Sequence, residues 1–87
     1  MKTIYKYELE TSDEQEIEMP LFSEIICLQL QNDKPYIWVK IDTEFTNHKF
    51  KFRTFGTGQP IEPEFNGTYI GTYQLLNGKL VFHVFKM

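Results

Sequence analysis

The sequence predicts an all-β fold: a small antiparallel barrel or two-layer sandwich of about six to seven short strands. Three observations lead to this prediction. Stretches rich in β-branched and aromatic residues alternate with turn signals along the whole chain. Within these stretches apolar and polar residues alternate with a period of two, which places them on opposite faces of a sheet. No helical periodicity extends beyond one turn, and no linker or repeat divides residues 1–87, so we expect one domain.

The first predicted strand is Thr3–Leu9, in which Tyr5, Tyr7 and Leu9 share one face. The acidic segment Thr11–Glu14 that follows is typical of a turn, and the same residues also fit a capping box that opens a helix. Too few apolar residues follow for an amphipathic helix, so a turn is the expected structure.

Two strands follow in the acidic and aliphatic part of the chain. The first of them, Gln15–Met19, ends where Pro20 interrupts the pattern. The next, Glu24–Gln31, is expected to turn three aliphatic side chains to one apolar face: Ile26, Leu28 and Leu30. A hairpin loop at Asn32–Pro35 then leads into Tyr36–Asp42. That strand is expected to place three β-branched residues inward, Ile37, Val39 and Ile41, and to leave Trp38 on the outer side.

The second half of the chain contains three predicted strands. In His48–Phe55 two phenylalanines face one way, and three basic residues face the other way: Lys49, Lys51 and Arg53. The irregular segment Gly56–Asn66 precedes the strand Thr68–Leu76. Asn77-Gly78 is a strong signal for a two-residue hairpin turn into the last strand, Leu80–Lys86.

Composition and charge limit the function classes. The formal net charge of −3 has the wrong sign for binding phosphate backbones, which argues against nucleic acid. Cys27 is the only cysteine, so neither an intramolecular disulfide nor a Cys-based zinc site can form. Met1–Glu10 lacks the apolar region of a signal peptide, and no apolar run approaches the length of a membrane span. We therefore expect a protein of the reducing cytoplasm with no membrane association.

The residues that could carry chemistry show no catalytic or metal-ligating spacing. Cys27, His48 and His83 are far apart in the sequence, and the carboxylates that alternate between Glu14 and Glu18 are typical of a solvated edge strand. We therefore predict that the protein is not an enzyme and needs no cofactor or metal.

The most unusual segment is the glycine-rich stretch after the basic strand, with Arg53, Phe55, Gly56, Thr57 and Gly58. Glycines at these positions allow positive φ and can expose backbone N–H groups as an anion-binding nest, with Arg53 as a bidentate partner. The alternative is a structural bulge or turn.

Two further features contribute to a candidate binding surface. The basic face beside Phe55 and Trp38 could stack and clamp single-stranded nucleic acid, or it could pair across strands with the acidic N-terminal strands. His83 is either exposed on an apolar stripe with Val81 and Phe85, as at an interface, or buried as a core histidine.

Five segments of the chain resemble a family of small uncharacterised phage and prophage proteins: Lys2–Leu9, Gln15–Pro20, Phe52–Ile61, Tyr69–Thr72 and Val81–Phe85. The most specific part of the resemblance is the pattern FGTGxPI followed by the terminal FHVF. The resemblance implies a phage or prophage origin and carries over no functional residues.

We therefore expect a non-enzymatic phage accessory protein that binds a host component, either a protein, for example one of host defence, or a small anionic ligand. The expected binding residues are Arg53, Phe55, Gly56, Thr57, Gly58, Trp38 and His83. The alternative is a minor virion or assembly protein that forms homo-oligomers through its strand edges.

Overall fold

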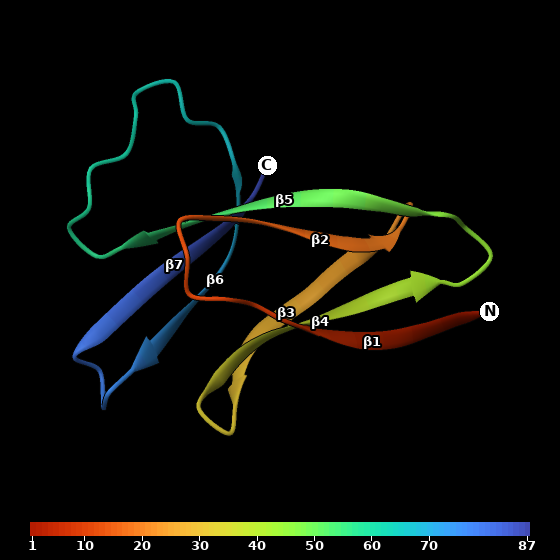
Figure 1. The fold of residues 1–87 in the computed structure, drawn as a ribbon, viewed down its shortest axis with the longest axis horizontal. Coiled ribbons are helices and arrows are strands. Elements are labelled where there is room, and N and C mark those ends of the chain that lie inside the picture. Colours follow the sequence, from red (N-terminus) through yellow and green to blue (C-terminus); the bar gives the residue numbers. More distant parts are fainter.

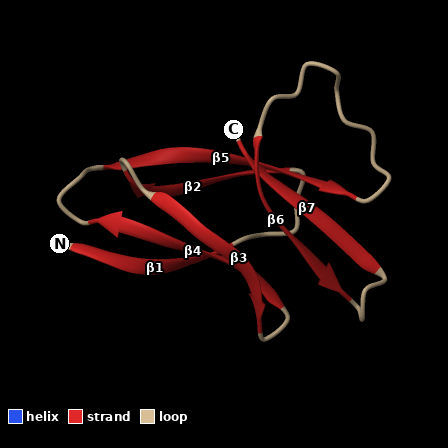
Figure 2. Cartoon of the chain, turned by 180° about the vertical axis from the view of Figure 1, so that it is seen from behind, coloured by secondary structure: helices blue, strands red, loops and turns tan.

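The computed structural model describes residues 1–87 and confirms an all-β fold of seven strands (Figure 1). The strands are β1 (Lys2–Glu8), β2 (Glu14–Pro20), β3 (Glu24–Gln31), β4 (Lys34–Asp42), β5 (Asn47–Gly56), β6 (Thr68–Leu75) and β7 (Leu80–Lys86). They form two antiparallel sheets, one in the order β1-β4-β3 and one in the order β2-β5-β7-β6. Because no hydrogen bonds join the two sheets, the fold is a sandwich and not a closed barrel. Seen from behind, strands and loops make up the whole chain (Figure 2).

Two tight turns set the register of the two local hairpins. Asn32 and Asp33 both have positive φ, at 53° and 63°, as a two-residue type I′ turn requires. The strand β4 therefore begins at Lys34, two residues earlier than the sequence predicted. In the other hairpin Leu75 pairs with Leu80, so the turn spans four residues and not the two that were predicted from Asn77-Gly78.

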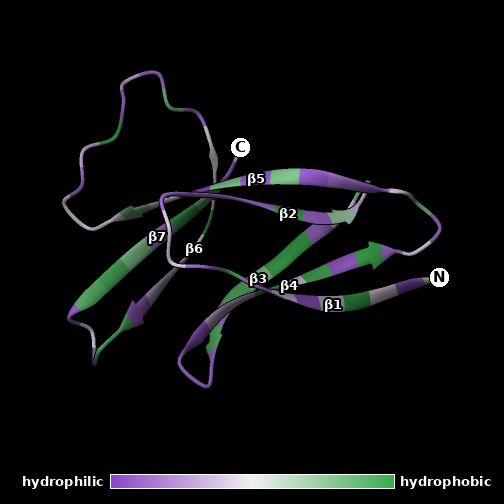
Figure 3. Ribbon diagram, in the orientation of Figure 1, coloured by the Kyte–Doolittle hydropathy of each residue, from purple (hydrophilic) through white to green (hydrophobic).

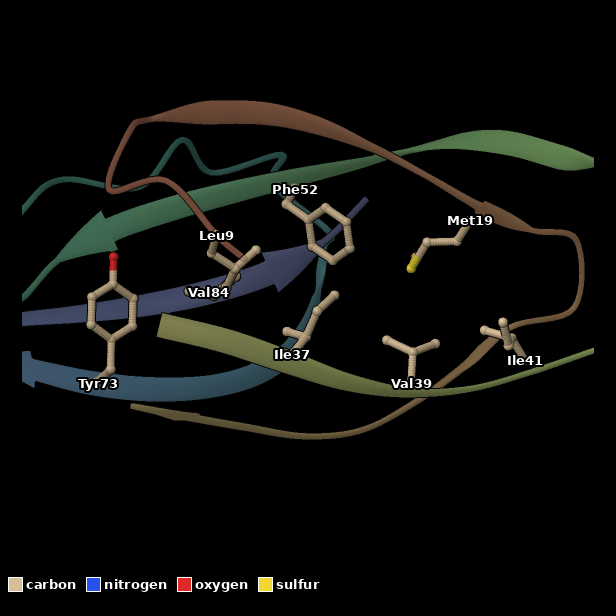
Figure 4. Packing of buried hydrophobic residues seen from close by; sticks show 8 residues of the cluster. All are labelled: Leu9, Met19, Ile37, Val39, Ile41, Phe52, Tyr73 and Val84. Atoms are coloured by element: carbon tan, nitrogen blue, oxygen red, sulfur yellow. The ribbon is translucent and has the colours of Figure 1, made fainter. Parts of the chain in front are cut away.

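The core lies between the two sheets, as Figure 4 shows. Eight buried side chains form it: Leu9, Met19, Ile37, Val39, Ile41, Phe52, Tyr73 and Val84. The three inward residues predicted for β4 are all among them, and Phe52 points inward from β5 as expected. The alternation of apolar and polar residues therefore assigned the buried faces of β4 and β5 correctly.

The buried face of β3 differs from the prediction. A register shift between Ile25 and Cys27 in the pairing with β4 marks a β-bulge. The bulge changes the phase of the strand, so that Ile25 and Leu28 both pack against the core. Ile26 is 54% exposed as a result, and the prediction that it shares one face with Leu28 was wrong.

The two sheets approach each other most closely where β6 crosses β3. A β-carbon built on Gly71 would lie 3.0 Å from the β-carbon of Leu28, which is closer than side-chain carbons pack. The absence of a side chain at Gly71 therefore allows β6 to lie against β3. This contact closes one side of the sandwich, and the opposite side is lined by β1 and β2.

Candidate functional site

The glycine-rich segment forms a tight turn at the end of β5. Gly58 has φ of 89°, a conformation that favours glycine. The Gly56 N–H donates to Oε1 of Gln59 at 2.9 Å, and the Thr57 N–H donates to the Val81 carbonyl at 3.1 Å. The Gln59 N–H donates to the Gly56 carbonyl at 3.0 Å. Because three of the four amides in the turn have partners within the chain, the geometry is that of the structural turn and not that of an anion nest.

This turn places Thr57 against His83 on the outer face of the four-stranded sheet. Thr57 Oγ1 lies 2.7 Å from His83 Nε2, and Thr72 Oγ1 lies 2.9 Å from His83 Nδ1. The Tyr69 hydroxyl lies 2.6 Å from Thr72 Oγ1, which extends the network along β6. We call these four residues the polar row. Both nitrogens of the imidazole have hydroxyl partners, so the ring is held in a defined orientation.

The strand pairing explains how the polar row arises. His83 pairs with Phe55 on one side and with Thr72 on the other. Because Val84 is in the core, His83 points outward from the sheet and is half-buried, so it is neither a core residue nor fully exposed. Its neighbours on this face are Val81 and Phe85, as expected for the outward-facing residues of β7.

Arg53 lies on the same outer face, but other side chains of the chain already engage its guanidinium group. Nη2 lies 3.0 Å from Oε1 of Glu62, and Nε lies 3.8 Å from Oε1 of Glu14. The guanidinium also stacks over Phe55, with 4.7 Å between Arg53 Cζ and the ring centroid. Only 17% of the side chain is exposed. These contacts give Arg53 a structural role. Little of its guanidinium group is left free to bind an external anion.

Phe55 lies beneath Arg53 and is only 2% exposed. Its ring makes edge contacts with Phe65, at 5.1 Å between centroids, and with Phe85, at 5.9 Å. Tyr69 extends this outer aromatic cluster with a contact of 5.6 Å to Phe85. Phe65 comes from the long loop between β5 and β6, so the cluster holds this loop against the sheet. Phe55 therefore supports the surface from below and does not form part of it.

The basic face of β5 is paired with acidic residues of β2. In the register of the two strands Glu14 faces Arg53, Glu16 faces Lys51, and Glu18 faces Lys49. This arrangement corresponds to the cross-strand alternative and not to a free basic surface. Figure 3 shows the hydrophilic character of β2 next to the mixed β5.

Trp38 lies on the other side of the sandwich. It points outward from β4, between the inward residues Ile37 and Val39, and makes an edge contact of 5.9 Å with Tyr36. The structure therefore does not bring Trp38 to the polar row, and its grouping with the glycine-rich turn was wrong. The reason is that β4 and β5 belong to different sheets, so their outer faces point in opposite directions.

The remaining reactive side chains are also separated. Cys27 pairs with Trp38 in the three-stranded sheet, and His48 pairs with Met19 at the far end of β5 from His83. No group of three or more His, Cys, Asp or Glu side chains is placed to hold a metal ion. The structure also contains no helix with the length and hydropathy that a membrane span requires.

A cleft of about 450 Å³ opens near one end of β3 and β6. Its nine lining residues are Met19, Ser23, Glu24, Ile25, Ile26, Thr68, Tyr69, Ile70 and Lys86. Tyr69 thus contributes to both the cleft wall and the polar row. None of the seven residues predicted as binding residues lines this cleft.

Sequence reasoning missed Thr72 and Tyr69. A signal for Thr72 was present, because counting outward from the Asn77-Gly78 turn places Thr72 opposite His83, as observed. Tyr69 could not be found in this way, because a register shift between Tyr69 and Gly71 changes the count.

The ion pair between Glu62 and Arg53 leads to a prediction about pH. The pKa of Glu62 lies below its ordinary value, because its own backbone N–H and then Arg53 donate hydrogen bonds to the carboxylate. A lowered pKa in the folded state stabilises the protein above the ordinary pKa, and the contribution disappears as pH falls through the folded value. We therefore expect Glu62→Gln to destabilise the protein at pH 7 and to lose this effect in acid, once the pH is below the folded pKa of Glu62, as measured by urea denaturation at the two pH values.

Glu64 lies in the same loop and makes no ion pair, so Glu64→Gln serves as the matched control. We expect Glu64→Gln to change the free energy of unfolding only slightly, and by the same amount at both pH values. An equal loss for Glu62→Gln at both pH values would contradict the role of the carboxylate charge.

Comparison with known proteins identifies a family but no characterised relative. No curated protein and no solved structure matches the chain. The whole chain, residues 1–87, matches the family described as domain of unknown function DUF7352. We conclude that the protein belongs to the DUF7352 family.

Proposed function

We propose that this protein is a non-enzymatic binding protein that engages a protein partner through the polar row on the outer face of the four-stranded sheet. The observation that carries the proposal is the hydrogen-bonded chain from Thr57 through His83 and Thr72 to Tyr69. Side chains that are already ordered lose little conformational entropy on binding, which favours recognition. Tyr69 is 57% exposed and offers both an aromatic surface and a hydroxyl group.

Several features favour a protein partner over a small anion or a substrate. Glu14 and Glu62 already neutralise Arg53, and the amides of the glycine-rich turn are largely satisfied within the chain. His83 lies between two neutral hydroxyl groups and lacks the carboxylate that would stabilise a protonated ring in nucleophilic catalysis. These arguments support a binding role in which the side chains act as fixed hydrogen-bonding groups.

The biological setting of this proposal comes from the resemblance to small phage and prophage proteins. In that setting the protein acts in the cytoplasm of the bacterial host, and the partner is a host protein, for example a component of host defence. A virion or assembly component is the second candidate function, favoured by the unpaired strand edges β1 and β2. Purified phage particles would contain an assembly component and would lack a binding factor.

The test is capture of a partner from a bacterial lysate by the immobilised protein, with two histidine variants as a matched pair. His83→Ala removes the centre of the polar row and should lower the amount of captured partner about tenfold or more. His48→Ala removes an exposed histidine that is not part of the polar row and should capture as much as the wild type. Circular dichroism would establish that both variants are folded. Equal capture by the two variants would contradict the assignment of the polar row.

A further inference from the structure

The two sheets have four edge strands, and two of these, β1 and β2, lie on the same side of the molecule. β1 is an edge of the three-stranded sheet and β2 is an edge of the four-stranded sheet. The other two edges, β3 and β6, lie against each other at the contact between Gly71 and Leu28. Exposed edges present free N–H and C=O groups that can pair with another chain. Tyr5, which points inward from β1, is 47% exposed at this open side.

The backbone pairing determines which residues of each edge present free groups. The Leu9 N–H donates to Pro35, and the Thr43 N–H donates to Met1, so the odd-numbered residues of β1 bond to β4. In an antiparallel pair the bonded residues alternate, and the even-numbered residues therefore point their N–H and C=O groups away from the sheet. On β1 these residues are Lys2, Ile4, Lys6 and Glu8.

The same reasoning applies to β2. The Thr54 N–H donates to Asp13, and the Leu21 N–H donates to Thr46, so the odd-numbered residues of β2 face β5. The free backbone groups at this edge therefore belong to Glu14, Glu16 and Glu18. The side chains of these residues are exposed and lie on the outer face of the sheet, opposite to the buried Met19.

The charges of the two edges are complementary. The free positions of β1 carry Lys2 and Lys6, whereas all the free positions within Glu14–Glu18 carry carboxylates. Pairing of β2 with a second copy of β2 would place glutamates opposite glutamates, which is destabilising. Pairing of β1 with β2 instead places lysines opposite glutamates.

The directions and positions of β1 and β2 also fit pairing between two copies of the chain. β1 and β2 run antiparallel, and the start of β1 and the end of β2 lie at the same end of the molecule (Figure 1). We propose that two copies of this chain form a dimer about a two-fold axis parallel to these strands, in which β1 of each protomer pairs with β2 of its partner. In this register Lys2 faces Glu18 of the partner subunit, Ile4 faces Glu16, and Lys6 faces Glu14.

This arrangement satisfies the requirements of an isologous interface. Each copy uses the same two edges, so the assembly closes as a dimer and leaves neither β1 nor β2 free for further addition. The three strands of one protomer continue into the four strands of the other, on both layers of the sandwich. The open side of the core, with Tyr5 and the partly buried Ile17, becomes covered by the same side of the partner.

The test is sedimentation equilibrium of the purified full-length protein with charge-reversal variants at the two edges. The wild type should be a dimer. Lys2→Glu and Glu18→Lys should each raise the dissociation constant about tenfold, because each reverses one charge pair in both copies of the interface. The double variant Lys2→Glu/Glu18→Lys restores opposite charges and should return the dissociation constant to near that of the wild type.

Two variants away from the edges serve as controls for the change in net charge. Lys79→Glu, in the β6–β7 turn, and Glu64→Lys, in the long loop, should leave the dimer unchanged. A wild type that is monomeric at ~100 μM, or a dimer insensitive to both edge variants, would overturn the proposal. A tighter dimer for Glu18→Lys would also overturn it, because that result indicates that β2 pairs with a second copy of β2.

Discussion

Replacing Phe55 by alanine is expected to lower the free energy of unfolding by about 3–5 kcal/mol. The ring is 2% exposed and is enclosed by Phe65, Phe85 and the guanidinium of Arg53. Its removal leaves a cavity beneath the long loop, because Phe65 is held to the sheet by the same contacts. A loss of this size is comparable to the total stability of a domain of this length, so the variant should be partly unfolded in buffer. Urea denaturation followed by tyrosine and tryptophan fluorescence measures the effect.

Phe22→Ala is the control for this experiment. Phe22 is 71% exposed and makes an edge contact with the ring of Phe45, at 5.1 Å between centroids. Its removal should cost about 1 kcal/mol or less. If the two variants had equal stability, the outer aromatic cluster would not be a packed second core.

The second large effect is expected at the contact between the two sheets. Gly71→Ala places a methyl group 3.0 Å from the β-carbon of Leu28, so β6 has to move away from β3. Overpacking of this kind typically costs about 1–3 kcal/mol. The measurement is again the midpoint of urea unfolding. The m-value is the slope of the free energy of unfolding against urea concentration. If it is unchanged, the loss of free energy comes from the folded state and not from a change in the compactness of the unfolded state.

Gly56→Ala is the matched substitution, because the added β-carbon lies at ordinary distances of 3.9 Å or more and Gly56 does not have positive φ. This variant should be neutral or slightly stabilised, since alanine reduces the entropy of the unfolded chain. Equal destabilisation by the two variants would contradict the specific role of Gly71 in the approach of the sheets.

Most of the fold could be predicted from the sequence because each strand has one apolar face. The predicted bounds of β3 and β7 agree with the structure, and those of the other strands differ by one or two residues at one or both ends. The face of β3 could not be predicted, because the bulge that follows Ile25 inserts a residue without any signal such as glycine. The hairpin turn at Asn32-Asp33 was recognised, but Lys34 and Pro35 were assigned to the loop and not to β4.

The candidate site was less predictable, because it depends on which strands become neighbours. His83 and Thr57 were both identified, yet their contact requires β5 to pair with β7 across the long loop. Arg53 and Phe55 were predicted as binding residues from their place beside two glycines. In the structure the loop between β5 and β6 lies over them, so that Glu62 pairs with Arg53 and Phe65 packs against Phe55. Arg53 and Phe55 therefore make contacts within the chain. Trp38 was misplaced because the alternation of apolar and polar residues predicts only which face of its own sheet a residue occupies. It does not predict where that sheet lies relative to the other sheet.

The strand order also has consequences for how the chain folds. The hairpins β3–β4 and β6–β7 close over short turns and can form early. By contrast, β1 must find β4 with Tyr5 opposite Val39, and β2 must find β5 with Ile17 opposite Phe50, each across more than thirty residues of chain. Loop-closure entropy opposes both steps and also the pairing of β5 with β7 across the long loop. The rate of folding should therefore be set by these distant pairings, on a timescale of roughly milliseconds to seconds. Until β1 and β2 have docked, the early hairpins expose the side chains that later form the core, and the nascent chain is then most vulnerable to proteases and aggregation.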